Sequence, residues 1–222
     1  MEKIKTIGKA FLVFVLYLLI SIYLEVSFKI CFNSNNVFIS NASLILSNIF
    51  ILLIVSLFFL PTIIDDFKKI NKKDMKLAYK NWLKGLIVMY ISNIIIVLIN
   101  NDIASNESYN RELLYGMPVY AITVMVFIAP LIEEIIFRLS IKKAFKNKWI
   151  YAIVSGFIFG LMHMTTATSL VELLYIIPYG ALGFFFAKSV YETDNIWSSM
   201  LTHMTHNAAI ISILLISNLL GV

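Results

Sequence analysis

The chain has 222 residues, of which 60% are hydrophobic and 14% charged, and its formal net charge is +5. Its mean hydropathy is +0.86, and several apolar runs approach the ~18–20 residues that cross a bilayer. These values exclude a soluble globular protein and predict an all-α, polytopic membrane helix bundle in the cell membrane, in contact with the lipid bilayer. The lysines lie mostly in short connecting segments, and nothing in their arrangement indicates a nucleic-acid partner.

Seven apolar runs predict about seven transmembrane helices. They cover residues 8–30, 42–64, 84–100, 117–140, 149–168, 170–189 and 196–219. Three lysines, Lys3, Lys5 and Lys9, lie at or just before the start of the first run, as in a signal peptide, but no small-residue cleavage site comes after it. We therefore expect this run to stay in the bilayer as the first membrane helix.

Lysine placement tests this number of helices independently. Lysines occur before the first run and after the second, fourth and sixth, whereas the alternate connections contain only one basic residue, Arg111. The positive-inside rule then places the N-terminus in the cytoplasm and the C-terminus outside. Residues 65–83 mix lysines with apolar side chains, which predicts an amphipathic linker on the cytoplasmic surface.

Ionisable residues interrupt the fourth apolar run. Glu133, Glu134 and Arg138 lie within six residues of otherwise apolar sequence, shortly after Pro130. Each such group costs about 2.5–3.5 kcal/mol at the centre of a membrane helix, so intramembrane charges mark functional sites by default. Glu134 lies one helical turn from Arg138, so we expect these two to pair and Glu133 to be left for chemistry. The alternative is an ion-paired cluster that only holds helices together.

The chain's three histidines all lie in apolar runs as well. His163 follows Phe159 by four residues and His203 precedes Asn207 by four, so each pair shares a helix face, and His206 lies near the second face. A single histidine in a helix is usually a core residue, but three of them beside two glutamates favour catalysis. Carboxylate, imidazole and amide groups can together activate a water molecule and stabilise an oxyanion.

Depth along the helices constrains this site. Glu133 and His203 lie about 12–13 Å from the cytoplasmic ends of their helices, whereas His163 lies about 22 Å from its own. The three groups meet only if the fifth helix starts below the membrane surface, tilts, or bends near Gly156 and Gly160.

Three motifs resemble, in order and spacing, those of the CPBP family. This family comprises the type II CAAX prenyl endopeptidases and the bacteriocin-processing or immunity-type intramembrane proteases, also called Abi. The motifs are Glu133-Glu134-x-x-x-Arg138, Phe159-x-x-x-His163 and His203-x-x-x-Asn207. The resemblance implies a catalytic core over residues 115–215. It leaves residues 1–110 as N-terminal membrane helices that include the amphipathic linker.

The resemblance also implies an intramembrane endopeptidase whose cavity opens to the cytoplasmic side. When the family's roles are transferred to the matching positions, Glu133 is the general base and His163 holds the water molecule. His203 and Asn207 then bind the oxyanion, and Glu134 and Arg138 support the site.

Two assignments stay open. His206 lies outside the family pattern and could substitute for His203. Glu133, His163 and His203 could also supply three ligands to a zinc ion with an open fourth position. However, the sequence has no His-Glu-x-x-His signature, and water activation by glutamate and histidine needs no metal. We therefore expect no metal and no other cofactor.

The predicted function is an endopeptidase that hydrolyses a membrane-associated peptide or a membrane-protein substrate. The alternative is a non-catalytic bacteriocin self-immunity or scaffold protein, which would not need Glu133 and His163 together. A small transporter or proton-coupled channel ranks third. Embedded carboxylates and histidines also mark proton paths, but the chain shows no internal repeat.

Overall fold

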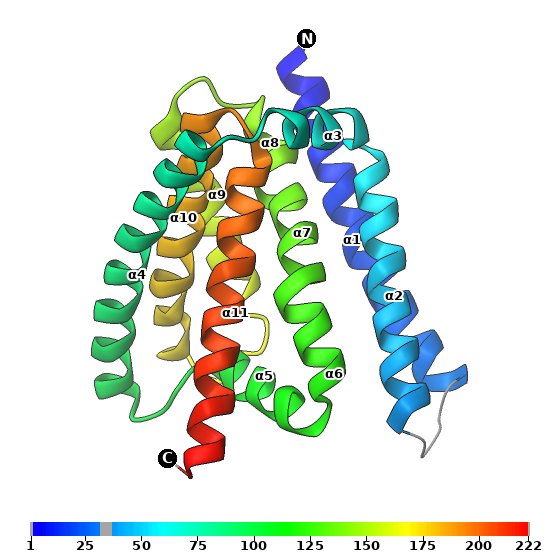
Figure 1. Cartoon of the computed structure of the whole chain (residues 1–222), viewed down its shortest axis with the longest axis vertical. Coiled ribbons are helices and arrows are strands. Elements are labelled where there is room, and N and C mark those ends of the chain that lie inside the picture. Colours follow the sequence, from blue (N-terminus) through cyan, green and yellow to red (C-terminus); the bar gives the residue numbers. More distant parts are fainter. Residues whose placement is uncertain (1, 32–36, 222) are drawn as a thin grey trace.

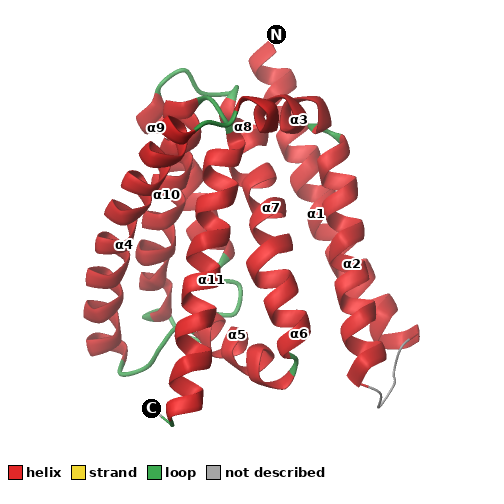
Figure 2. Ribbon diagram, in the orientation of Figure 1, coloured by secondary structure: helices red, strands yellow, loops and turns green. Residues whose placement is uncertain are grey.

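The computed structural model describes residues 2–31 and 37–221, which form a bundle of helices joined by short loops (Figures 1 and 2). No strand occurs in these residues, so the predicted all-α architecture is confirmed. Within the described part, six helical segments are long and apolar enough to cross a membrane. They are Ile4–Tyr23, Ile39–Leu57, Lys72–Asn100, Pro118–Lys142, Glu172–Thr193 and Ile196–Leu220. The protein is a multi-pass membrane protein.

The N-terminal helices pair with each other beside the rest of the bundle (Figure 1). Helix α1 spans Glu2–Cys31 and α2 spans Val37–Leu57. Helix α2 ends earlier than the predicted second run, because the chain turns and starts a new helix, α3, at Leu60–Lys69. Pro61 lies in the first turn of α3, where its missing N–H leaves no helical hydrogen bond unmade.

The predicted amphipathic linker at 65–83 does not form one separate element. Its first part belongs to α3, and its second part belongs to α4, which spans Lys72–Asn100 and so begins twelve residues before the predicted third run. Asn71 starts α4 there, because its side-chain oxygen accepts the backbone N–H of Asp74 at 3.0 Å.

The fourth membrane segment is not a uniform α-helix. It follows the short helix α5, Ser105–Gly116. Its parts are α6 (Pro118–Ala121), η1 (Ile122–Ile128), α7 (Ala129–Glu134), η2 (Ile135–Leu139) and α8 (Ser140–Lys142). The η1 and η2 segments have the wider π winding, in which the N–H of Ala129 reaches back five residues to the carbonyl of Val124. Pro130 has no N–H to continue the normal ladder, which favours this irregularity.

The predicted run at 149–168 is the shortest of the seven as a helix. Its helix, α9, spans Lys148–Met162 and has 15 residues, fewer than the ~20 that a spanning helix needs. The helix shows no break at Gly156 or Gly160.

These two glycines instead allow close packing of α9 against α10, Ile176–Thr193. A Cβ atom at Gly156 would lie 2.6 Å from the carbonyl oxygen of Gly180, and one at Gly160 would lie 2.6 Å from that of Ile176. The two backbones are therefore in direct contact. A short 3₁₀ turn, η3 (Glu172–Tyr175), leads into α10, and α11 (Ile196–Leu220) completes the chain.

The lysine-rich segments lie at one end of the bundle, as the alternation of lysines predicts. The N-terminus, α3, the connection from α8 to α9 and the start of α11 share this end, whereas α5 and the C-terminus lie at the other (Figure 1). Lys142 forms an ion pair with Asp194 there, and the Asn195 side chain donates a hydrogen bond to the carbonyl of Asp66 at 2.7 Å. That this end faces the cytoplasm stays a prediction.

Candidate active site

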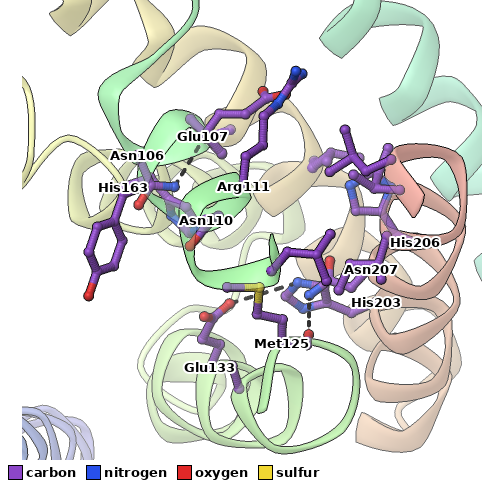
Figure 3. A pocket seen from close by; sticks show the side chains of 18 of the residues that line it. Asn106, Glu107, Asn110, Arg111, Met125, Glu133, His163, His203, His206 and Asn207 are labelled. Carbon is purple, nitrogen blue, oxygen red and sulfur yellow. Dashed lines mark hydrogen bonds and ion pairs between the residues drawn. The ribbon is translucent and has the colours of Figure 1, made fainter. Parts of the chain in front are cut away.

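A cavity of about 470 Å³ inside the bundle brings the predicted site residues together. Its lining includes Glu133 of α7, His163 at the end of α9, and His203, His206 and Asn207 of α11 (Figure 3). Glu134 and Arg138 lie behind this lining and are fully buried. Three motifs that are far apart in the sequence therefore converge on one space.

Glu134 is bound by three side chains. It is 0% exposed, and its carboxylate lies 3.3 Å from Nε of Arg138, the pairing that the four-residue spacing predicts. Ser199 donates its hydroxyl to Glu134 at 2.6 Å, and His203 donates its Nδ1–H at 2.9 Å. Sequence reasoning missed Ser199, although it lies one helical turn before His203 on the same face. A buried carboxylate with this many partners is held in a single orientation.

Arg138 is stabilised by aromatic rings as well as by Glu134. Its side chain is 0% exposed, and its guanidinium carbon lies 4.3 Å from the ring centre of Phe159, a cation–π contact. Its Nη1 and Nη2 atoms have no hydrogen-bond partner among the described residues. Phe159, which shares a motif with His163, thus also covers the charge behind the site.

Glu133 is the carboxylate that faces the cavity. Its side chain is 23% exposed, and its Oε2 lies 3.8 Å from Nε2 of His203, which is too long for a direct hydrogen bond. The His203 ring therefore stands between the two glutamates, bonded to Glu134 on one side and facing Glu133 on the other. Phe186 stacks on this ring with centroids 4.7 Å apart and restricts its rotation.

His163 is oriented by two contacts. Its Nδ1 lies 2.8 Å from the carbonyl oxygen of Phe159, so Nδ1 carries the donated proton and Nε2 of the neutral ring is an acceptor. The ring of Tyr179 stacks on it with centroids 4.5 Å apart and planes 22° apart. Tyr179 in turn receives a hydrogen bond at its hydroxyl from the side chain of Asn106 at 3.3 Å. No sequence motif marked Tyr179, because the contact depends on how closely α9 and α10 pack.

The histidines of α11 have different surroundings. His203 contacts both glutamates, whereas the His206 ring packs edge-on against Trp82 and its buried Nδ1 has no hydrogen-bond partner among the described residues. Of these two histidines, only His203 therefore lies against the glutamates. The amide of Asn207 donates one N–H to the carbonyl of Met125, within the π-wound segment η1, at 2.7 Å.

The donor groups around the cavity determine whether it can bind a metal ion. In the described residues, no three histidine, cysteine, aspartate or glutamate side chains are gathered in a way that could hold a metal ion. The Nδ1 atoms of His163 and His203 are both engaged in hydrogen bonds, to Phe159 and Glu134, which leaves Nε2 as the ring nitrogen that could bind a ligand. Dependence on a metal stays open to experiment.

Comparisons with known proteins agree with the motifs. Residues 115–209 match the family model described as type II CAAX prenyl endopeptidase Rce1-like, which confirms the family resemblance. An uncharacterized protein of Mycoplasma capricolum is 31% identical over 210 residues, which cover 83% of this chain and 59% of that protein. A Bacillus subtilis protein named "Putative membrane peptidase YdiL" is 26% identical over 161 residues, 65% of this chain and 63% of that protein.

The chain thus spans less than two thirds of the length of both relatives. No solved structure matches it. Neither relative's name refers to bacteriocins or immunity, so that role stays a prediction.

Proposed function

We propose that this protein is an intramembrane endopeptidase that hydrolyses a peptide bond of a membrane-associated peptide or protein. The match of residues 115–209 to the Rce1-like family model supports this proposal. One observation carries the proposal. Glu133 faces a cavity inside the bundle, while the histidines beside it are held in fixed orientations by hydrogen bonds at Nδ1. A protein that only binds a partner would not need this arrangement.

Glu133 is the general base in this mechanism. Its carboxylate takes a proton from a water molecule while the water oxygen forms a bond to the carbonyl carbon of the substrate. The resulting tetrahedral oxyanion then collapses, the carbon–nitrogen bond breaks, and the proton on Glu133 passes to the leaving amine nitrogen. Nε2 of His163 accepts the second hydrogen of the same water and orients it.

His203 and Asn207 are proposed to bind the oxyanion. The amide of Asn207 has two N–H groups, of which one donates to the Met125 carbonyl and the other is available to the substrate. His203 already donates Nδ1–H to Glu134, so it donates to an oxyanion through Nε2 only when both ring nitrogens are protonated. Loss of one such donor typically lowers kcat by about 10²–10³-fold.

The proposal is tested by mapping new protein N-termini in membranes of cells that express the chain. Wild type is compared with Glu133→Gln and His163→Gln at matched expression. Glu112→Gln is the control, because this exposed glutamate of α5 lies outside the cavity lining. We expect N-termini that appear with wild type and the control but disappear with both site variants.

Two outcomes would contradict the proposal. Cleavage that persists at full rate in Glu133→Gln excludes this glutamate as the base. If wild type produces no new N-termini, yet protects cells against a peptide toxin as well as both variants do, the chain is a binding protein of the immunity type.

A further inference from the structure

The cavity at Glu133 extends to a second, polar wall that no motif marked. Helix α5 contributes the side chains of Asn106, Glu107, Asn110 and Arg111 to the lining (Figure 3). These residues lie at positions i, i+1, i+4 and i+5, which form one face of a helix. The polar face of α5 is therefore turned toward the cavity and not only toward water.

Contacts with η3, the 3₁₀ turn before α10, hold this face of α5 in place. Ser105 donates its hydroxyl to the carboxylate of Glu172 at 2.7 Å, and Tyr175 donates to the carbonyl of Asp102, just before α5, at 2.6 Å. Asn106 adds its hydrogen bond to the Tyr179 hydroxyl. Helix α5 is thus a built wall of the cavity, connected through Tyr179 to the ring of His163.

The chemistry of the α5 face suits a peptide backbone. Arg111 and Glu107 form an ion pair at 2.5 Å, so their opposite charges cancel. The amide side chains of Asn106 and Asn110 are both donors and acceptors. An extended peptide that leaves water carries N–H and C=O groups that need such partners. The face thus offers hydrogen bonds without selecting a charged ligand.

A second part of the cavity lies between α4 and α11. Near the lysine-rich end these helices are joined by a hydrogen bond between Tyr79 and Thr205 at 3.0 Å. Closer to α5, Tyr90 of α4 and Leu214 of α11 line the cavity instead, and Tyr90 is 44% exposed. Apolar parts of a substrate can therefore lie between these helices.

The other side of the site is tightly packed. From His203 toward the lysine-rich end, the next layer contains Arg138, Ser199 and Met200, all at most 1% exposed. The cavity lining includes residues of α5 but none of α3 or of the connection from α8 to α9. The cavity therefore extends from Glu133 toward the α5 end.

We infer that the substrate is a peptide segment that reaches Glu133 from the lysine-poor face, with its backbone against α5 and its apolar side chains between α4 and α11. By the positive-inside rule this face is the outer one, opposite to the cytoplasmic opening that the family resemblance implies. The inference deepens the proposed function and rests on it. The substrate class is then a translocated peptide, or the outer juxtamembrane part of a membrane protein.

Single cysteines test the route. Cys31, the chain's one cysteine, is changed to serine, and Asn110→Cys, Ser108→Cys or Lys146→Cys is added. Asn110 reports the cavity, Ser108 is exposed on α5 outside the cavity lining, and Lys146 is exposed at the lysine-rich end. Intact and permeabilised cells are treated with a bulky, membrane-impermeant maleimide. We expect labelling of Asn110→Cys and Ser108→Cys in intact cells, and of Lys146→Cys only after permeabilisation.

The labelled cells are then assayed for Glu133-dependent cleavage. Modification at Asn110→Cys should lower cleavage at least tenfold, and modification at Ser108→Cys should leave it unchanged. Labelling of Asn110→Cys only after permeabilisation, or full cleavage after its modification, overturns the inference. If no Glu133-dependent cleavage exists in any sample, the proposed function has failed, and the labelling pattern by itself still decides from which side the cavity is reached.

A larger side chain in the lining tests the part of the cavity that lies between α4 and α11. Leu214→Trp places a larger side chain in the lining, whereas Leu219→Trp changes a residue of the same helix that is 84% exposed. We expect Leu214→Trp to raise KM at least several-fold for cleaved peptides with apolar flanks, with no change for Leu219→Trp. Equal KM values for both variants would exclude the part of the cavity between α4 and α11 as a binding site.

Discussion

His203 donates its Nδ1–H to Glu134 at 2.9 Å and turns Nε2 toward Glu133 at 3.8 Å. One imidazole thus connects a fully buried carboxylate with its sequence neighbour in the cavity. The two glutamates differ by about 100° around the helix, which is enough to give one a structural environment and the other a reactive one. Their substitutions should therefore have different effects.

Glu133→Gln should abolish cleavage without unfolding the protein. Its side chain faces the cavity, so the isosteric amide removes the base and little else. We expect a loss of about 10²–10⁴-fold in kcat, the usual contribution of a general base. The melting temperature in detergent should stay within a few degrees of wild type, which a thermal-shift assay measures together with cleavage.

Glu134→Gln should instead lower stability. It leaves the guanidinium of Arg138 buried without its ionic partner, and removing one member of a buried pair costs about 3–5 kcal/mol. The expected result is a clear fall in melting temperature, with loss of activity that follows the loss of folded protein. A Glu134→Gln variant as stable as wild type would show that Arg138 does not depend on this carboxylate.

The sequence was sufficient to predict that the residues of the three motifs lie together, because charges and histidines inside apolar helices are costly unless they share a polar site. Glu133, His163, His203 and Asn207 all line one cavity, as expected. The depth mismatch of the fifth helix did not prevent this convergence. Helix α9 is continuous through Gly156 and Gly160, and these glycines bring it close to α10.

Other features depend on tertiary packing and left no signal in the sequence. Tyr179 reaches His163 only because α9 and α10 pack backbone to backbone, and α5 becomes a cavity wall only through its contacts with Glu172 and Tyr175. The start of α4 was also predicted wrongly from the sequence. The Asn71 cap begins α4 among the lysines, where hydropathy alone predicts a surface linker.

Tyr179 is predicted to position His163, and two substitutions separate its two contacts. Tyr179→Phe keeps the stacked ring and loses the hydrogen bond with Asn106, so kcat should fall by no more than about fivefold, in line with ~1 kcal/mol for one hydrogen bond. Tyr179→Leu also removes the stacking and should lower kcat by a further tenfold or more, with KM little changed. Tyr23→Leu, at an exposed position of α1, is the control.

The split between kcat and KM, measured per folded molecule, distinguishes positioning from general loosening of the bundle. A Tyr179→Leu variant whose whole deficit disappears after correction for the folded fraction would contradict a positioning role.

Cleavage should not depend on a metal ion. In the described residues no metal-ligand cluster is formed, and the proposed chemistry uses water, a carboxylate and imidazoles. Purified protein in liposomes should retain its rate after prolonged treatment with a strong chelator and dialysis. Loss of activity that added zinc restores, without change in a Glu133→Gln sample, would show that the site rearranges around a metal.

The glycine contact between α9 and α10 should be among the most sensitive positions outside the site. A Cβ at Gly156 would lie 2.6 Å from the Gly180 carbonyl oxygen and 2.7 Å from the Phe184 nitrogen, both of them backbone atoms that cannot rotate away. Forcing the helices apart typically costs about 1–3 kcal/mol. It would also move His163, at the end of α9, away from Tyr179. Gly156→Ala should therefore lower both melting temperature and kcat.

Two other glycines provide graded controls for this experiment. A Cβ at Gly180 would meet its nearest atom at 3.3 Å, and one at Gly8 would meet nothing within 4 Å. Gly180→Ala should have a smaller effect than Gly156→Ala. Gly8→Ala should be neutral or slightly stabilising, because alanine is favoured over glycine in a helix by up to about 1 kcal/mol. Equal melting temperatures for all three variants would mean that α9 and α10 do not pack as closely as the structure shows, and the contact between Tyr179 and His163 would then lose its basis.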